Sequence, residues 1–103
     1  MRKVCIVIGS RANYSSIKSV MSAVKEHSSL ELQLVATASA VVDRYGAVVN
    51  LIESDGFKVD RHISTLVEGE SLVTMAKSTG LGMIELASTF DVLKPDVVLT
   101  VGD

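Results

Sequence analysis

Two short segments of the chain are apolar at nearly every position, and each is followed by glycine. Residues 4–8 read Val-Cys-Ile-Val-Ile before Gly9, and residues 97–101 read Val-Val-Leu-Thr-Val before Gly102. Such a run is typical of a strand whose two faces are both covered, whereas a half-exposed strand alternates apolar and polar residues. Both segments are therefore predicted to be fully buried strands, and the first to be central in a parallel sheet.

Two further segments alternate. Leucines at every second position lead from Leu30 into Val35 and Ala36, which predicts a second strand. Residues 57–63 place Phe57, Val59 and Ile63 between polar neighbours, which predicts a third strand. Because this third strand is half polar, we expect it near an edge of the sheet.

Apolar residues at helical spacing fill the three connections. A first helix is predicted after Ser15 or Asn13 as its N-cap, and a second after Ser39, ending at Ser54-Asp55-Gly56. A third is predicted from Glu70 to about Leu93. Their predicted buried residues are Ile17, Val20, Met21 and Val24; then Val41, Val42, Tyr45, Val48, Val49 and Ile52; then Val73, Ala76, Gly80, Met83, Ala87 and Phe90.

Glycine within the third helix calls for an explanation, because each glycine costs about 1 kcal/mol relative to alanine in a helix. Gly80 and Gly82 are expected to allow either a close approach of the helix to the sheet or a kink. Lys94-Pro95-Asp96 then ends the helix.

The resulting order, β-α-β-α-β-α-β, predicts one α/β domain over residues 1–103. Such alternation gives a Rossmann-like open parallel sheet with helices on both faces. Strand order 3-2-1-4 places the half-polar third strand at one edge. It also opens a crevice between strands 1 and 4, where ligands of such sheets bind. Val97–Val101 then forms an edge without proline or charge, which predicts pairing with a second copy, a homodimer.

Composition narrows the function. The net charge is −2 and no Lys or Arg stripe occurs, so a nucleic-acid partner is not expected. No apolar stretch is long enough for a bilayer, which argues against a membrane protein and favours the cytoplasm. Cys5, the single cysteine, is predicted to be a buried structural thiol. His27 and His62 are predicted to be solvated, and no metal site is expected.

Two segments reach the predicted crevice: residues 9–15 after the first strand, and Gly102-Asp103 after the fourth. Gly9 permits a close backbone approach, and the planar guanidinium of Arg11 suits phosphate. Ser15 and the amides of the helix N-terminus add donors. Lys18 either points at this pocket or is simply exposed. Ordinary loop chemistry, with Asp103 acting as a helix cap, remains an equal interpretation of these residues.

The ordered set of segments resembles the UDP-N-acetylglucosamine 2-epimerases, especially the hydrolysing class of sialic-acid-type pathways. The resemblance spans essentially the whole chain. It rests on residues 9–15 (Gly-Ser-Arg-Ala-Asn-Tyr-Ser), 43–46 (Asp-Arg-Tyr-Gly), 52–57 (Ile-Glu-Ser-Asp-Gly-Phe), 75–81 (Met-Ala-Lys-Ser-Thr-Gly-Leu) and 93–103 (Leu-Lys-Pro-Asp-Val-Val-Leu-Thr-Val-Gly-Asp).

The resemblance implies the N-terminal part of a two-domain GT-B enzyme that binds a UDP-sugar between its domains. It implies elimination of UDP to a 2-acetamidoglucal and hydration to N-acetylmannosamine, without a redox cofactor. By match, Arg11 and Ser15 are substrate-binding positions, joined by Gly9 and Lys18 from the pocket argument. By the same match, Asp103 resembles the family's catalytic acidic residue near the sugar, with an acid–base or electrostatic role. The second domain is not among these 103 residues, so they are expected to be inactive alone.

Two positions depart from the family pattern. Asn13 stands where an acid is usual, and Ala40 where many members have histidine, after a glycine that is Ala38 here. Such changes allow a related substrate, such as a UDP-diacetamido-trideoxyhexose. Tyr14 and Ser15 favour hydrolysis by resemblance.

Other functions stay open. A GT-B glycosyltransferase shares the architecture. A stand-alone α/β nucleotide-binding module is the other alternative, although the chain has Gly9-Ser10 where a receiver domain needs paired acids.

Overall fold

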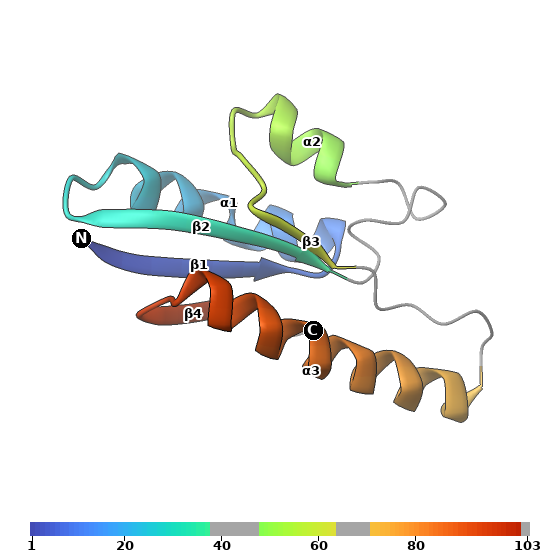
Figure 1. Ribbon diagram of the computed structural model, residues 1–103. Helices are drawn as coiled ribbons and strands as arrows, with labels where there is room; N and C mark the ends of the chain where they lie inside the picture. The colour runs from blue at the N-terminus through green and yellow to red at the C-terminus, as the bar shows by residue number, and fades with distance from the viewer. Residues whose placement is uncertain (38–47, 64–70, 102–103) are drawn as a thin grey trace.

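A parallel sheet of four strands forms the centre of the molecule (Figure 1). This computed structural model describes residues 1–37, 48–63 and 71–101. The spatial order β3-β2-β1-β4 confirms the predicted order 3-2-1-4 and the Rossmann-like α/β class. The elements are β1 (Arg2–Ile8), α1 (Arg11–Glu26), β2 (Leu30–Thr37), α2 (Val48–Ser54), β3 (Arg61–Ile63), α3 (Leu72–Leu93) and β4 (Val97–Thr100).

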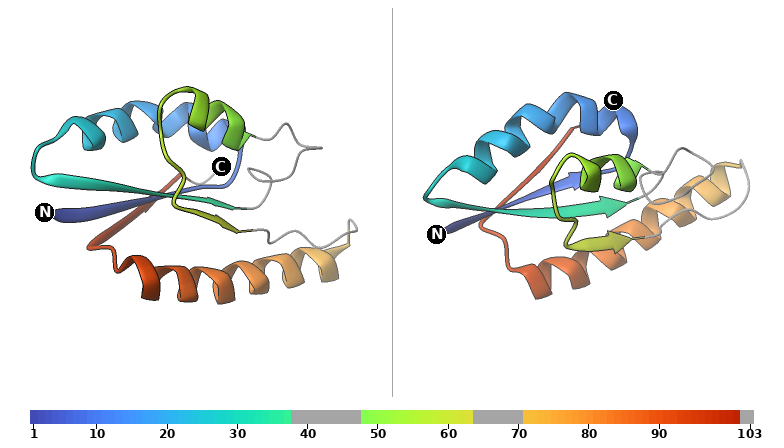
Figure 2. Two further views of the ribbon diagram at one scale, coloured as in Figure 1. Left: turned by 45° about the horizontal axis from the view of Figure 1, so that its top comes forward. Right: turned by 90° about the horizontal axis from the view of Figure 1, so that it is seen from above.

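Helices cover both faces of the sheet, α1 and α2 on one side and α3 on the other (Figure 2). Successive side chains of a strand point to opposite faces, so β1 supplies both cores. Val4, Ile6 and Ile8 pack in the core beneath α1 and α2. Cys5 and Val7 lie in the smaller core, which contacts α3. The prediction that the first strand is buried on both faces is confirmed.

Cys5 is fully buried and unpaired, as predicted. Burial, with a smaller contribution from the negative charge of Asp60, raises the pKa of its thiol to about 11. Because the thiolate is the reactive form, this thiol is chemically quiet at neutral pH.

Helix α1 begins earlier than predicted. Its N-cap is Ser10, not Ser15 or Asn13, because the extended backbone of Ser10 lets its hydroxyl accept the N–H of Asn13. The earlier start adds Tyr14 to the buried face. The prediction for Val20 was wrong, since this side chain is 41% exposed.

The third strand is shorter than predicted, with only residues 61–63 paired to β2. The cause is Asp60. Its carboxylate accepts the N–H of Leu34 at 2.8 Å, and its own N–H donates to the Leu34 carbonyl at 2.9 Å. A side-chain oxygen thus takes the place of a strand carbonyl, and residues 57–59 are not paired with β2. Phe57 and Val59 are nonetheless buried, and the edge position of the strand is confirmed.

Helix α2 is described from Val48, so the predicted cap Ser39 and residues 41–47 lie outside the described part of the chain. Val48, Val49 and Ile52 are buried as expected. The predicted stop is also confirmed: the helix ends at Ser54, and Gly56 has a φ of 94°, which glycine adopts without a Cβ clash.

Helix α3 begins after Ser71, whose hydroxyl forms a capping box with Thr74, rather than at Glu70, which lies outside the described residues. It ends at Leu93, and Lys94 caps it in the left-handed region with a φ of 48°. The stop predicted at residues 94–96 is therefore confirmed.

The predicted buried stripe of α3 was wrong. Val73 and Met83 are 62% and 70% exposed, and only Phe90 of the six residues packs partly against the core. Leu86 and Leu93 face the sheet together with Phe90, so the buried face of α3 is rotated by about a quarter of a helical turn from the predicted stripe. The amino-terminal half of α3 extends past the strands (Figure 1), so no sheet lies beneath it there.

Gly80 illustrates the same error. We expected its missing side chain to allow a close approach to the sheet or a kink. A Cβ added there would meet no atom within 4 Å among the described residues, so the close-approach explanation is wrong.

Strand β4 also differs from its prediction. Val97, Val98 and Leu99 are 41%, 43% and 37% exposed, although a fully buried strand was expected. Among the described strands β4 pairs with β1 alone, so its other edge carries free backbone groups. An apolar run therefore marks a strand suited to burial without showing that a neighbour covers it.

We expect the 103-residue chain expressed alone to self-associate through this edge, because unpaired backbone beside apolar side chains favours strand pairing. Sedimentation velocity at micromolar concentration should show dimers or larger species, and Val98→Lys should weaken them. Leu51→Lys, at an exposed apolar residue of α2, is the control that should not. A monodisperse monomer with slow amide exchange in β4 would contradict this expectation.

Candidate active site

The carboxyl ends of β1 and β4 frame the predicted crevice. The two strands are parallel neighbours, with Val7 opposite Thr100. The chain leaves β1 for α1 on one face and reaches β4 from α3 on the other face (Figure 2). This divergence is the switch point at which open α/β sheets bind ligands. Gly102 and the predicted catalytic residue Asp103 follow β4, and both lie outside the described residues.

A hydrogen-bonded turn joins β1 to α1. The side-chain oxygen of Asn13 accepts the N–H of Gly9 at 3.1 Å, and the hydroxyl of Ser10 accepts the N–H of Asn13 at 3.1 Å. A Cβ on Gly9 would lie 3.1 Å from the same Asn13 oxygen, which is tight. Glycine therefore lets the turn close, and Asn13 uses its amide oxygen to hold it.

Arg11 and Ser15 lie in the first two turns of α1, and both are exposed. Residues four apart in a helix are neighbours on its surface, so the guanidinium and the hydroxyl belong to one face. Apart from the Asn13 N–H, which Ser10 caps, the first backbone N–H groups of α1 have no acceptor within the helix. Two side-chain donors and a positive helix end thus stand together, an arrangement suited to an anion.

Lys18 is exposed, one of its two predicted alternatives, and it is paired with a carboxylate from another element. Its ammonium lies 3.1 Å from a carboxylate oxygen of Asp55, in the loop after α2, and 5.8 Å from the centre of the Tyr14 ring. The Tyr14 hydroxyl donates a hydrogen bond to the same Asp55 oxygen. We call Tyr14, Lys18 and Asp55 the α1–α2 clamp.

The clamp shifts two ionisations. Hydrogen bonds from Tyr14 and then Lys18 hold the pKa of the Asp55 carboxyl below its usual value of 3.8. Burial first, and then the hydrogen bond and negative charge of Asp55, raise the pKa of the Tyr14 phenol above 10. At neutral pH the clamp therefore contains a charged carboxylate and a neutral phenol.

The clamp was not predicted from the sequence. A signal was present, because Tyr14 continues the stripe of Ile17, Met21 and Val24 one turn towards the N-terminus. Placing the cap at Ser15 or Asn13 hid it. Asp55 was interpreted only as part of a helix stop.

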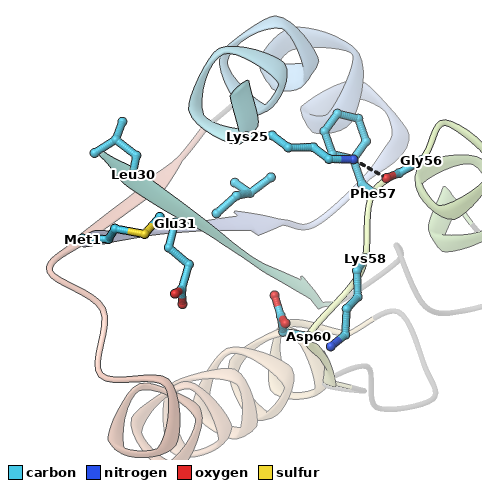
Figure 3. A pocket seen from close by; sticks show the side chains of 9 residues that line it. Met1, Lys25, Leu30, Glu31, Gly56, Phe57, Lys58 and Asp60 are labelled. Carbon is cyan, nitrogen blue, oxygen red and sulfur yellow. Dashed lines mark hydrogen bonds between the residues drawn. The ribbon is translucent and has the colours of Figure 1, made fainter. Parts of the chain in front are cut away.

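A cavity of about 340 Å³ lies at the opposite end of the sheet, beside the amino ends of β1 and β2 (Figure 3). Met1, Leu30 and Phe57 contribute apolar surface. The Lys25 ammonium donates to the Gly56 carbonyl and lies 5.2 Å from the centre of the Phe57 ring. This cavity is separate from the crevice between β1 and β4, and the Lys25 ammonium that lines it is already bonded to Gly56 and lies over Phe57.

Within the described residues, no three His, Cys, Asp or Glu side chains form a group that could hold a metal. His27 and His62 are exposed, as predicted. None of the helices described is both long enough and apolar enough to cross a membrane.

Comparison with known proteins gives one consistent result. Residues 22–103 match the family model described as UDP-N-acetylglucosamine 2-epimerase. A hydrolysing GDP/UDP-N,N'-diacetylbacillosamine 2-epimerase of Campylobacter jejuni is 29% identical over 102 residues, 99% of this chain and 26% of that protein. A hydrolysing UDP-N,N'-diacetylbacillosamine 2-epimerase of Legionella pneumophila is 29% identical over 103 residues, all of this chain and 27% of that protein.

Solved structures agree on the fold. A UDP-N-acetylglucosamine 2-epimerase structure superposes with a TM-score of 0.77 at 20% identity, over 94% of this chain and 25% of that one. The Neisseria meningitidis enzyme, solved with UDP-GlcNAc bound, gives 0.71 at 18% identity, over 93% and 24%. The chain thus spans about a quarter of the length of these relatives.

Replacing Ser10 should destabilise the turn that carries Arg11. We expect Ser10→Ala to lower the free energy of unfolding by about 1 kcal/mol, because an N-cap hydroxyl is lost. Urea denaturation followed by circular dichroism measures this. Ser16→Ala, at an exposed serine within α1, is the matched control and should change little. Equal stability of the two variants would show that Ser10 does not cap the helix.

The clamp should make the free energy of unfolding fall as the pH is lowered into the acidic range. Asp55 has a lowered pKa in the folded state, so its contribution is present above pH 3.8 and is lost as the pH falls through the lowered value. Tyr14→Phe removes the hydrogen bond from the Tyr14 hydroxyl, which is the largest cause of the lowered Asp55 pKa. We therefore expect a shallower loss of unfolding free energy between pH 5 and pH 2 in Tyr14→Phe, measured by urea titrations. A loss as steep as in the unaltered protein would contradict the assignment.

Proposed function

The chain belongs to the UDP-N-acetylglucosamine 2-epimerase family, and on that premise we propose that it is the N-terminal part of a hydrolysing 2-epimerase. The proposed substrate is UDP-N-acetylglucosamine or a related UDP-2-acetamido sugar. The proposed products are UDP and a sugar of the N-acetylmannosamine type. Because the chain spans about a quarter of its relatives, the activity belongs to the full-length protein, meaning everything that its gene encodes.

The observation that carries this proposal is the exposed donor set at the switch point. Arg11 and Ser15 share a face of α1, directly after Gly9 ends β1. A guanidinium binds phosphate oxygens through two parallel hydrogen bonds, and the helix N-terminus adds favourable dipole and amides. The bound UDP-GlcNAc in the Neisseria meningitidis structure supports a diphosphate as the ligand of this fold.

The proposed chemistry needs no external oxidant or reductant. The proton on C2 leaves, the bond between C1 and the UDP oxygen breaks, and a 2-acetamidoglucal and UDP form. Water then adds across the double bond, with hydroxide at C1 and a proton at C2 on the opposite face. We propose that Arg11 and Ser15 stabilise the departing UDP, and that Asp103 acts in proton transfer or electrostatic stabilisation near the sugar.

Two features favour a hydrolysing reaction and a UDP-diacetamido sugar as substrate. The Campylobacter jejuni and Legionella pneumophila relatives are both named as hydrolysing enzymes of diacetylbacillosamine, a diacetamido sugar. Asn13 stands where an acid is usual in the family. Its side-chain oxygen accepts the Gly9 N–H, and it adds no negative charge beside Arg11. A UDP-diacetamido sugar is therefore included among the proposed substrates. We also propose a homodimer, and a GT-B partner domain that closes the crevice.

The decisive experiment incubates the purified full-length protein with UDP-N-acetylglucosamine and, separately, with UDP-N,N'-diacetylbacillosamine. UDP release is followed by a coupled assay and the free sugar by NMR. Release of UDP together with a C2-inverted sugar is expected from one of them. Inversion of the nucleotide sugar without release of UDP would overturn the hydrolytic assignment, and transfer of the sugar to an acceptor would point to a glycosyltransferase.

Arg11→Lys tests the phosphate contact. Lysine keeps the charge but loses the planar two-point fork, so UDP binding should weaken by about 1–3 kcal/mol, the range for hydrogen bonds to charged groups. Isothermal titration with UDP measures the change in the full-length protein. Lys77→Arg, at an exposed position of α3, is the control. Unaltered UDP affinity in Arg11→Lys would refute the role.

A further inference from the structure

We infer that Asp55 is a positioning residue of the nucleotide-sugar site, acting through Tyr14 and Lys18 to set where Arg11 and Ser15 meet the substrate. This inference rests on the proposed function and deepens it. Asp55 itself touches neither Arg11 nor Ser15. It acts on the helix that carries them.

The first step is the geometry of the contact. Asp55 follows α2 and is 41 residues from Tyr14 in sequence. A single carboxylate oxygen accepts both the Tyr14 hydroxyl and, at 3.1 Å, the Lys18 ammonium. Two donors one helical turn apart on α1 are thus held at one point of the loop after α2. A two-point attachment restricts rotation of α1 about its axis as well as its displacement.

The two attachment points lie in the same part of α1 as the proposed substrate-binding side chains. Tyr14 and Lys18 bracket Ser15, and Lys18 lies seven residues after Arg11, on the same helical face. Helical side chains lean towards the N-terminus, which agrees with the Lys18 ammonium lying over the Tyr14 ring. Rotating α1 would therefore break the clamp and redirect the two substrate-binding side chains together.

The third step concerns charge. Lys18 is paired with a carboxylate, and its side chain is 48% exposed. Arg11 has no carboxylate partner among the described residues, so on this face it is the cation available to a diphosphate. Lys18, expected from the sequence as a substrate ligand, is assigned instead to holding the helix.

The charge of Asp55 determines the direction in which UDP affinity should change when this residue is replaced. If Asp55 only repelled phosphate or withheld Lys18 from it, Asp55→Asn would tighten UDP binding. If Asp55 positions α1, Asp55→Asn loses the ion pair and weakens the bond to Tyr14, so UDP binding becomes weaker. The two mechanisms therefore predict opposite changes in the same measurement.

The experiment uses the full-length protein, with UDP as the titrated ligand and steady-state kinetics on the substrate identified above. We expect Asp55→Asn to weaken UDP about threefold to tenfold, the size of one net hydrogen bond, and to raise KM while kcat changes less than twofold. Asp55→Glu should recover part of the affinity. Glu53→Gln, an exposed carboxylate in the last turn of α2, is the control and should leave UDP affinity unchanged.

A double-mutant cycle separates positioning from stability. In an Arg11→Lys background the effect of Asp55→Asn on UDP affinity should shrink, because Asp55 acts through the placement of Arg11. Tyr14→Phe and Lys18→Met, which cut the clamp from its other side, give the same readout if Asp55→Asn does not fold.

UDP affinity that is unchanged or tighter in folded clamp variants would overturn the inference. Fully additive effects of Asp55→Asn and Arg11→Lys would overturn it as well. Absence of UDP binding by the unaltered protein would overturn the proposed function and this inference together. The two failures are therefore distinguishable.

Discussion

Burial of β1 on both faces is the constraint from which the rest of the structure follows. A strand that buries Cys5 and Val7 on one side and Ile6 and Ile8 on the other needs a helical layer on each side of the sheet. The chain meets this need by sending α1 to one face and α3 to the other. The layers part at the carboxyl end of β1, so the same constraint that stabilises the core also determines where the proposed ligand site lies.

Much of this fold was predictable because the decisive patterns are local. The continuous apolar run of β1, the alternation from Leu30 and the half-polar third strand together specified the class and the strand order. The errors arose where a distant partner decides the outcome. The Asp60 carboxylate accepts the Leu34 N–H in place of a backbone carbonyl and shortens β3. Val73 and Met83 are exposed, because the part of α3 that carries them extends past the described strands. Periodicity shows that a face is apolar, but not which surface it meets.

The candidate site also contains residues that local sequence predicts and residues that it does not. Gly9, Arg11 and Ser15 follow a buried strand directly, so sequence alone placed them at the switch point. The link from Tyr14 and Lys18 to Asp55 spans about forty residues and depends on how α1 lies beside α2. A helix-stop pattern contains no information about that contact. Asp103, beyond the described residues, stays a prediction from resemblance.

The carboxylate of Asp60 has a consequence for how copies of this sheet can grow. It occupies the N–H of Leu34 on the edge of β2 that faces β3, and β3 is three residues long and begins with Arg61 and His62. The β3 edge of the described sheet is therefore short and polar, whereas β4 at the other edge is the strand through which self-association is predicted. Fibrils elongate only when every added unit presents a fresh growing end. A copy with only one free strand edge can pair with one other copy, and the resulting dimer has no free edge left for further growth.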